Sequence, residues 1–395
     1  MPSDTVRHPS ARRVDAALES HGLIDRVREL PASTRTAEDA ARALGCEVRQ
    51  IVKSLVFHRE PSGTPVLALV AGDHRLDEAW MHRVTGERWS RADPERVRSA
   101  TGFAIGGVPP IGHAEALPTY IDYDLLEQRE IWAAAGHPNA VCRITSPELL
   151  RITGGRPVSV VPLHPRHQAP GGWVSFDCYG TIVDWRRGIL DQVGKLLVPG
   201  NETERARIFS EYLQEERALE EGPYRSYREI VSEAIRRVSQ RLGRALTSDE
   251  ANRLPESIPT WPLFPDSKRG LDRLRQQGRR VAILSNIDRD LLDRTISENA
   301  LPVDLSITAE EVRSYKPAFA HWIRLLKETG MSPEQGLHVS ASFGHDIEPA
   351  SALGFPTVYV ERYAPLPQGL RAASTVQSLE QIPPSSHVGA GGPEP

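Results

Sequence analysis

The sequence predicts an α/β protein of two domains, in which an α+β domain precedes a doubly wound parallel sheet with a helical cap. The chain has 395 residues, enough for two or three domains. A stretch rich in Pro, Gly and basic residues, Thr153–Trp173, divides it, and strands alternate regularly with helices only after this stretch. We expect domains at 1–165 and 173–370, a linker at 166–172 and a disordered tail at 371–395.

The first domain begins with a predicted helix over residues 11–30. Its apolar residues at helical spacing are Val14, Ala17, Leu18, Ile24 and Val27. A second helix is predicted where Thr36 and Asp39 have capping-box spacing and Gly45 provides the stop. Two apolar strands, 51–60 and 65–72, then flank a turn-forming segment, and short strands mixed with Gly-Pro loops complete an α+β pattern.

The second domain begins with an apolar strand at 173–176. A long helical region follows from 186 to about 254, and helices and strands then alternate up to residue 362. This order predicts a Rossmann-like parallel sheet. The helical region would form a cap, at about 186–262, over the carboxyl ends of the strands, where ligands bind in such folds.

Composition and charge exclude several classes of protein. The net charge of −4 argues against non-specific nucleic-acid binding by bulk charge, although a local basic groove is compatible with it. No apolar run approaches membrane-spanning length, so we expect no membrane partner. The cysteines Cys46, Cys142 and Cys178 form no CxxC pair, which favours a reducing, cytoplasmic location.

Four polar clusters follow predicted strands of the second domain, and the carboxyl ends of parallel strands meet at one edge of a sheet. These clusters are Asp177 with Thr181, Ser285 with Asn286, Lys316, and Asp346. They would supply one pocket with a carboxylate nucleophile, hydrogen-bond donors, a cation that steadies the carboxylate, and a second acid.

The motifs "FDCYGTIVDW", "ILSNID", "VRSYKP" and "HDIEPASALGFPTVYV" resemble the four motifs of the haloacid dehalogenase superfamily, over about residues 172–362. The resemblance implies that Asp177 is the nucleophile, and that Thr181 and Ser285 bind the departing group beside Asn286. It also implies that Lys316 is the conserved positive residue and Asp346 the closing acid. Together these six residues would form the site for a small-molecule acid.

Tyr179 stands where phosphatases of this superfamily carry a second Asp that protonates the leaving group. A phenol with an ordinary pKa of about 10 is a poor proton shuttle at neutral pH. The pattern therefore resembles the branch that cleaves carbon–halogen bonds, in which Tyr179 would contact substrate and no cofactor is needed. Ala341 also stands where an acid often supports magnesium. The alternative is a Mg²⁺-dependent phosphatase, with Asp177 and Asp346 as metal ligands.

Departures from that branch leave the exact substrate open. Trp322 replaces a tyrosine, and the cap arginine that would bind a substrate carboxylate has three candidates, Arg217, Arg225 and Arg228. We expect cleavage of a C–X bond in a small 2-substituted acid or an amino-acid analogue.

In the first domain, Lys53 interrupts an apolar strand, and a buried ammonium needs a partner. The loop "GFAIGGVPPIG" supplies glycines that let a ligand approach backbone N–H groups. Together these features indicate either an anion or acyl-ester site, or a snorkelling lysine beside an ordinary turn.

The segments "TAEDAARALGCEVRQIVKSLVF", "GFAIGGVPPIGH" and "AAGHPNAVCRITSPELLRITGG" resemble the aminoacyl-tRNA deacylases of the YbaK/ProX family, over about residues 10–161. The resemblance implies hydrolysis of mischarged tRNA at its aminoacyl 3′ end, with Lys53 as the central residue. The implied substrate-binding residues are Gly106, Gly107, Pro109, Gly136 and His137. Positioning of ester and water would carry the reaction. The alternative is a tRNA-binding module without catalysis.

Overall fold

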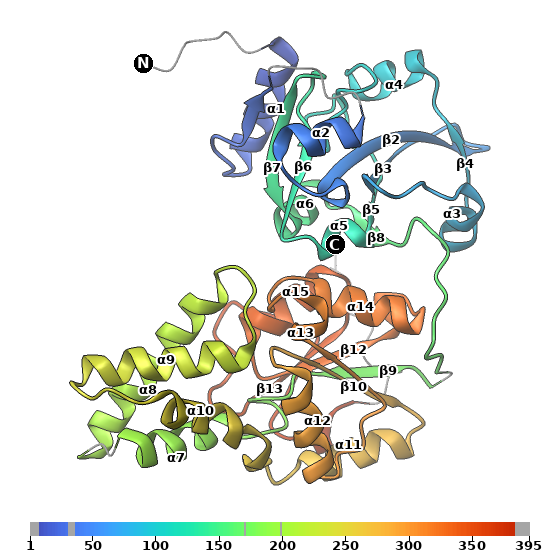
Figure 1. The fold of residues 1–395 in the computed structure, drawn as a ribbon. Helices are drawn as coiled ribbons and strands as arrows, with labels where there is room; N and C mark the ends of the chain where they lie inside the picture. Colours follow the sequence, from blue (N-terminus) through green and yellow to red (C-terminus); the bar gives the residue numbers. More distant parts are fainter. Residues whose placement is uncertain (1–7, 31–35, 170, 198–199, 384–395) are drawn as a thin grey trace. The chain divides into compact units, whose positions relative to one another are not determined.

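The computed structural model describes residues 8–30, 36–169, 171–197 and 200–383. The chain forms two compact units, Met1–His164 and Pro165–Pro395, each with its own sheet (Figure 1). This division places an α+β unit before a parallel α/β unit, so the predicted fold class is confirmed.

The first unit is built on an eight-stranded mixed sheet in the order β1-β7-β6-β2-β3-β5-β8, with β4 paired to β2. The strands are β1 (Val27–Glu29), β2 (Ile51–Glu60), β3 (Pro65–Ala71), β4 (Arg88–Arg91), β5 (Thr119–Asp122), β6 (Glu130–Ala134), β7 (Ala140–Thr145) and β8 (Arg156–Val158). The helices are α1 (Pro9–Ser20), α2 (Ala37–Leu44), α3 (Glu78–Thr85), α4 (Pro94–Thr101), α5 (Tyr123–Glu127) and α6 (Ser146–Thr153).

The predicted helix over 11–30 was too long. Helix α1 ends at Ser20, and Val27 lies in strand β1 instead. Gly22 and Asp25 both adopt positive φ, 77° and 56°, which an α-helix cannot accommodate. The apolar spacing continued across a turn that these two residues impose.

Local capping explains α2, and two apolar runs separated by a turn explain the β2–β3 hairpin. The Thr36 side chain accepts a hydrogen bond from the Asp39 amide, and Gly45 closes the helix at φ 68°, as the sequence predicted. Strands β2 and β3 pair antiparallel, with Lys53 opposite Val70. The central strand β3 is almost wholly buried, so the hairpin forms the middle of the domain.

The second unit has a six-stranded parallel sheet in the order β11-β10-β9-β12-β13-β14. The strands are β9 (Trp173–Phe176), β10 (Arg280–Ser285), β11 (Leu305–Thr308), β12 (Leu337–Ser340), β13 (Thr357–Val360) and β14 (Ser374–Val376). The helices outside the cap are α11 (Ser267–Gln276), α12 (Arg289–Glu298), α13 (Ala309–Val312), α14 (Ala320–Thr329) and α15 (Glu348–Ala352). Strand β9 lies between β10 and β12, so Asp177, which follows it, lies near the middle of the carboxyl edge of the sheet.

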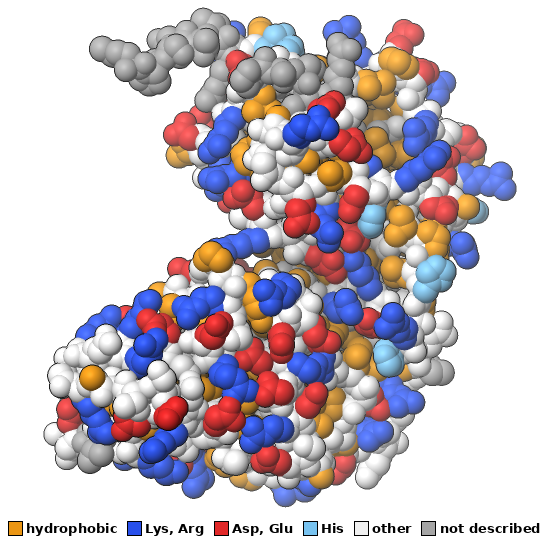
Figure 2. Space-filling view, viewed as in Figure 1, with side chains coloured by type: hydrophobic (Ala, Val, Ile, Leu, Met, Phe, Trp, Pro, Cys, Tyr) orange, Lys and Arg blue, Asp and Glu red, His pale blue; other side chains and the backbone are white. Residues whose placement is uncertain are grey.

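The predicted cap consists of four helices, α7 (Trp185–Leu197), α8 (Glu202–Glu220), α9 (Tyr227–Arg241) and α10 (Ser248–Ser257), which Figure 1 shows beside the sheet of this unit. Apolar residues bury one stripe of each helix; Tyr212, Ile230 and Leu254 are fully buried. On the face shown in Figure 2, basic and acidic side chains are interspersed over these helices. Among the described residues, no helix is long and apolar enough to span a bilayer.

The expectation of a disordered tail at 371–395 is wrong for residues 371–383. Strand β14 adds to the sheet beside β13, and Leu379 is fully buried. The Leu379 amide donates to Asp266 at 2.6 Å, and its side chain packs so closely on Gly270 that a methyl group there would lie 2.4 Å from it. These contacts, which composition did not reveal, order the chain to residue 383; residues 384–395 lie outside the described part.

The expected linker at 166–172 contacts the second unit. The amides of Arg166 and His167 both donate to the carbonyl of Glu328, at 2.9 and 3.0 Å. The boundary between the two units falls at His164 and Pro165.

Leu379→Ala should lower the free energy of unfolding of the second unit by about 2–5 kcal/mol, because it opens a cavity under a buried leucine. Urea unfolding of the full chain, with hydrogen exchange of β9 and β10 peptides as the domain-specific signal, measures this. The control is Leu370→Ala, since Leu370 is 39% exposed. A loss of stability in Leu379→Ala no larger than that in Leu370→Ala would show that the Leu379 side chain contributes no packing.

Candidate functional site

The first candidate active site begins at Asp177, directly after the central strand β9. The Asp177 amide donates to the carbonyl of Val339 on β12, which fixes the turn. The Thr181 hydroxyl donates to Asp177 Oδ2 at 2.9 Å and accepts from the Ala341 amide at 3.0 Å. The carboxylate is therefore aimed by its neighbours on both sides, and 11% of the side chain remains exposed.

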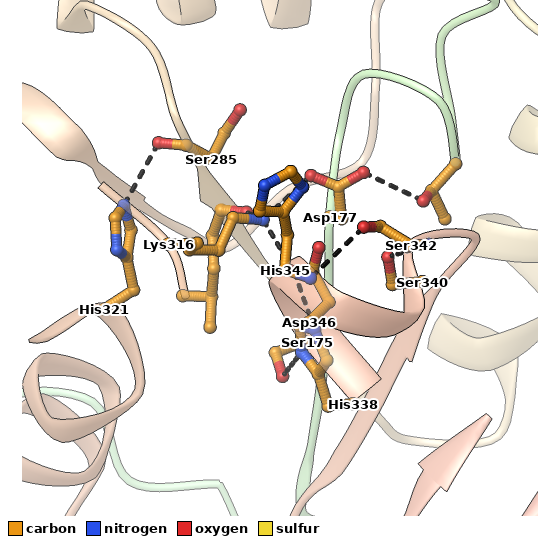
Figure 3. Close-up of polar contacts among 12 residues, drawn as sticks. Ser175, Asp177, Ser285, Lys316, His321, His338, Ser340, Ser342, His345 and Asp346 are labelled. Atoms are coloured by element: carbon orange, nitrogen blue, oxygen red, sulfur yellow. Dashed lines mark hydrogen bonds and ion pairs between the residues drawn. The ribbon is translucent and has the colours of Figure 1, made fainter. Parts of the chain in front are cut away.

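Lys316 joins three strand ends through one buried ammonium (Figure 3). Its Nζ donates to Asp177 Oδ1 at 2.9 Å, to Asp346 Oδ1 at 2.6 Å and to the carbonyl of Leu284 at 2.9 Å. An ammonium has three donors, so these contacts use its full capacity. The predicted convergence of Asp177, Lys316 and Asp346 is confirmed.

The buried charges determine one another's protonation. Burial raises the pKa of Asp177, while the Lys316 ammonium acts in the opposite sense and favours the carboxylate. Burial also opposes ionisation of Asp346, but Lys316 and His338 together outweigh it and lower the pKa of that carboxyl. Burial disfavours the ammonium of Lys316, yet the two carboxylates raise its pKa. The site thus holds a fixed cation between two acids.

Asn286 positions Lys316 through the backbone. Its Oδ1 accepts from the Lys316 amide at 2.7 Å, and its Nδ2 donates to the Lys316 carbonyl at 3.2 Å. We expected Asn286 to bind substrate, but these bonds hold the lysine loop. Ser285 is buried at the end of β10, where its carbonyl contacts His321 Nε2 at 3.2 Å.

Two histidines of the site were not predicted. His338 on β12 contacts Asp346 Oδ1 through Nε2 at 3.2 Å and Ser175 Oγ through Nδ1 at 2.9 Å. His345 lies beside the Asp177–Lys316 pair in Figure 3, and burial lowers its pKa. A histidine within the apolar strand "LHVS" was the available signal for His338, because a buried imidazole needs a partner.

The Tyr179 hydroxyl is bonded to Thr295 Oγ1 at 2.7 Å, and its ring meets Trp261 edge-on. Burial raises its pKa well above the usual value. A phenol held in this way is an even weaker acid than the sequence suggested. Its hydroxyl is engaged with Thr295, so the predicted substrate contact of Tyr179 stays a prediction.

The three candidate arginines of the cap differ in their surroundings. Arg228 is paired with Glu256 and with Asp290, so its charge is already neutralised. Arg217 is exposed near the end of α8, and its charge helps to lower the pKa of His345. Arg217 is therefore the candidate whose charge acts on the site.

The second candidate site is a pocket of about 410 Å³ in the first unit, lined by Lys53, Gly106 and His137 among others. Lys53 Nζ donates to the carbonyl of Gly72 at 2.9 Å and also to that of His74. Burial lowers the Lys53 pKa. The lysine predicted as a central residue thus faces a cavity, with its ammonium fixed by backbone carbonyls.

A buried acid, Asp122, bonds to the histidine whose carbonyl accepts from Lys53. His74 Nδ1 bonds to Asp122 Oδ2 at 2.8 Å, and this bond is the main cause of the raised His74 pKa. Asp122 is fully buried and also accepts from the Ala71 amide. With Asp124, these side chains place three possible metal-ligand atoms within 4.8 Å of one another. Residues far apart in sequence form this cluster, which is why motif reading missed it.

The predicted glycine loops pack against each other. A methyl group on Gly107 would lie 3.0 Å from the backbone of Gly136 and His137, so a larger residue would force this backbone to shift. The His137 ring accepts from the Asn139 amide at 3.2 Å. Pro109 is buried, and its carbonyl contacts His113. Gly106 and His137 line the pocket, whereas Gly107, Pro109 and Gly136 lie outside its lining.

Comparison with known families assigns each unit. Residues 31–152 match the model of the aminoacyl-tRNA editing domain, and residues 173–354 match that of the haloacid dehalogenase-like hydrolases.

Individual relatives match one unit each. The uncharacterized protein YwhH of Bacillus subtilis is 32% identical over 123 residues, which are 31% of this chain and 78% of the relative. An (S)-2-haloacid dehalogenase of Pseudomonas fluorescens is 26% identical over 191 residues, 47% of this chain and 83% of the relative. The crystal structure of the L-2-haloacid dehalogenase RSc1362 is 23% identical, with a TM-score of 0.49, and covers 55% of this chain and 98% of its own.

Both resemblances predicted from the motifs are therefore confirmed, and the protein is a hydrolase. The chain belongs through its first unit to the aminoacyl-tRNA editing domain family, and its second unit matches the model of the haloacid dehalogenase-like hydrolases.

Proposed function

We propose that the second unit hydrolyses a C–X bond in a small 2-substituted acid or amino-acid analogue, through a covalent ester on Asp177. The observation that carries this proposal is the buried ammonium of Lys316, bonded to both Asp177 and Asp346. It favours the charged carboxylate in a site where burial raises the pKa of Asp177. Arg217 would hold the substrate carboxylate.

The reaction has two steps. An Asp177 oxygen forms a bond to the substrate carbon while the C–X bond breaks, and the leaving group departs with the bonding pair. Water then attacks the carboxyl carbon of the aspartyl ester, which releases an alcohol and restores Asp177. The low pKa of His345 keeps its imidazole neutral near pH 7, so that it can accept the proton of this water.

The donor set fits magnesium poorly. Mg²⁺ requires several oxygen ligands in octahedral geometry. Here the Lys316 ammonium bridges the two candidate ligands Asp177 and Asp346, and Ala341 offers no side-chain oxygen. We therefore propose catalysis without a metal, and we favour C–X cleavage over phosphate release.

We propose that the first unit deacylates mischarged aminoacyl-tRNA. Support comes from its family, whose description names aminoacyl-tRNA editing, and from the pocket that Lys53, Gly106 and His137 line. The pocket would receive the aminoacyl 3′ end. The Lys53 ammonium, held by two carbonyls, would orient the ester beside a water molecule.

A single turnover in oxygen-18 water should place the label in the Asp177 carboxylate, because water attacks the ester at the carboxyl carbon. Mass spectrometry of the Asp177 peptide measures this, and Asp177→Asn is the unreactive control. Label found only in the released alcohol would mean that water attacks the substrate directly.

Treatment with EDTA should leave halide release by the second unit unchanged, since Lys316 already supplies the positive charge. Assays with 2-chloropropionate and with an aryl phosphate, each with and without added Mg²⁺, make the comparison. Magnesium-dependent phosphate release would instead support the phosphatase.

Lys53→Ala should reduce deacylation of mischarged tRNA by about 100-fold, because the ester loses its positioning cation. Binding of the tRNA should remain. Arg49→Ala is the control, since Arg49 is largely exposed and paired with Glu47. Absence of deacylation in the wild type, with tRNA still bound, would support a binding module without catalysis.

A further inference from the structure

Helix α1 contacts the glycine loop of the pocket in the first unit. The Arg13 guanidinium donates to the carbonyls of Thr101 and Gly102, at 3.3 and 3.2 Å. It also lies over the Phe103 ring, 3.7 Å from the ring centroid. These contacts hold the start of the loop, although α1 precedes residues 31–152, which match the editing-domain model.

The start of α1 contacts the second loop of the same pocket. Gly136 has a φ of 85°, and a methyl group there would lie 2.6 Å from the carbonyl oxygen of Ser10. The His8 ring, which caps α1, stacks on the His137 ring with 4.4 Å between the centroids and 29° between the planes. His137 lines the pocket, so the residue that caps α1 covers one face of a pocket side chain.

Backbone hydrogen bonds determine where the two imidazoles carry their protons. His8 Nδ1 accepts from the Ser10 amide at 3.2 Å, and the His8 amide donates to Glu29 Oε1 at 3.1 Å. His137 Nδ1 accepts from the Asn139 amide at 3.2 Å. A ring nitrogen that accepts a hydrogen bond carries no proton, so each neutral imidazole has its proton on Nε2.

The stack restrains the orientation of the pocket histidine. An imidazole can adopt several rotamers about its two side-chain bonds unless its neighbours restrain it. For His137, the restraints are the Asn139 amide at Nδ1 and the His8 ring on one face. Both act on a side chain that lines the cavity together with Lys53.

We propose that His8 is a positioning residue for deacylation in the first unit. Its ring holds His137 so that the Nε2–H of His137 donates to the carbonyl oxygen of the aminoacyl ester. This inference rests on the proposed function of the pocket, and it extends the working site to α1, outside residues 31–152. His8 acts through His137 and needs no contact with the ester.

Two substitutions in the full-length protein separate the stack from the helix cap. His8→Asn keeps an acceptor for the cap of α1 but loses the stack, whereas His8→Phe keeps the stack but loses the cap. The probes are tRNAs charged with alanine, serine or cysteine, and the readout is single-turnover deacylation with protein in excess.

His8→Asn should lower the rate constant by about 5- to 10-fold, as expected for the loss of one aromatic contact, and His8→Phe should retain it. The affinity for the tRNA should stay the same in both variants. His21→Ala is the control and should leave the rate unchanged, since His21 is exposed at the other end of α1.

A double-mutant cycle with His137→Ala tests whether His8 acts through His137. Adding His8→Asn to His137→Ala should cause no further loss of rate. A purely structural contribution of His8 would instead lower the rate by the same factor in both backgrounds. Nitrogen-15 NMR of labelled histidine, with His137→Ala for assignment, should show the Nε2–H tautomer of His137 in the wild type and altered His137 signals in His8→Asn.

The outcomes distinguish this inference from the proposed function. An unchanged rate in His8→Asn, an equal loss in His8→Phe, or an equal further loss in the His137→Ala background overturns the positioning role. Absence of deacylation by the wild type with all three tRNAs overturns the proposed function of the first unit. The NMR spectra then decide whether His8 holds His137: altered His137 signals in His8→Asn support it, and unchanged signals overturn it.

Discussion

The second unit depends on one buried ammonium shared by two carboxylates. Removing Lys316 would leave Asp177 and Asp346 as uncompensated neighbours, a costly arrangement in a site that excludes most water. Much of the surrounding structure serves this contact: Asn286 holds the lysine backbone, Thr181 aims Asp177, and His338 supports Asp346. The same ion pairs therefore set the charge of the proposed nucleophile and stabilise the local structure.

The first unit handles its pocket lysine differently. Lys53 is bonded to the backbone carbonyls of Gly72 and His74, and it is the His74 ring that bonds to Asp122. Because its contacts are dipoles and not carboxylates, burial can lower its pKa, whereas the pKa of Lys316 is raised. In the described part of the chain, the Lys53 ammonium is thus held by backbone carbonyls and not by an ion pair.

The sequence predicted well which polar side chains meet at the sheet edge, because a polar residue that follows a buried parallel strand lies at the carboxyl end of that strand. Asp177, Lys316 and Asp346 followed from that pattern. The break at Gly22 and the ordered chain around Leu379 did not, since each depends on backbone angles or on packing against distant residues.

The central claim is that Lys316 keeps Asp177 ionised. The measurement is a pH titration of Asp177 by carbon-13 NMR in protein with labelled aspartate, in the wild type and in Lys316→Met, with Asp177→Asn for assignment. The account predicts that the Asp177 pKa moves upward when the ammonium is removed, because burial then acts unopposed. A pKa that stays the same or falls in Lys316→Met, in a protein that hydrogen exchange shows to be folded, would contradict it.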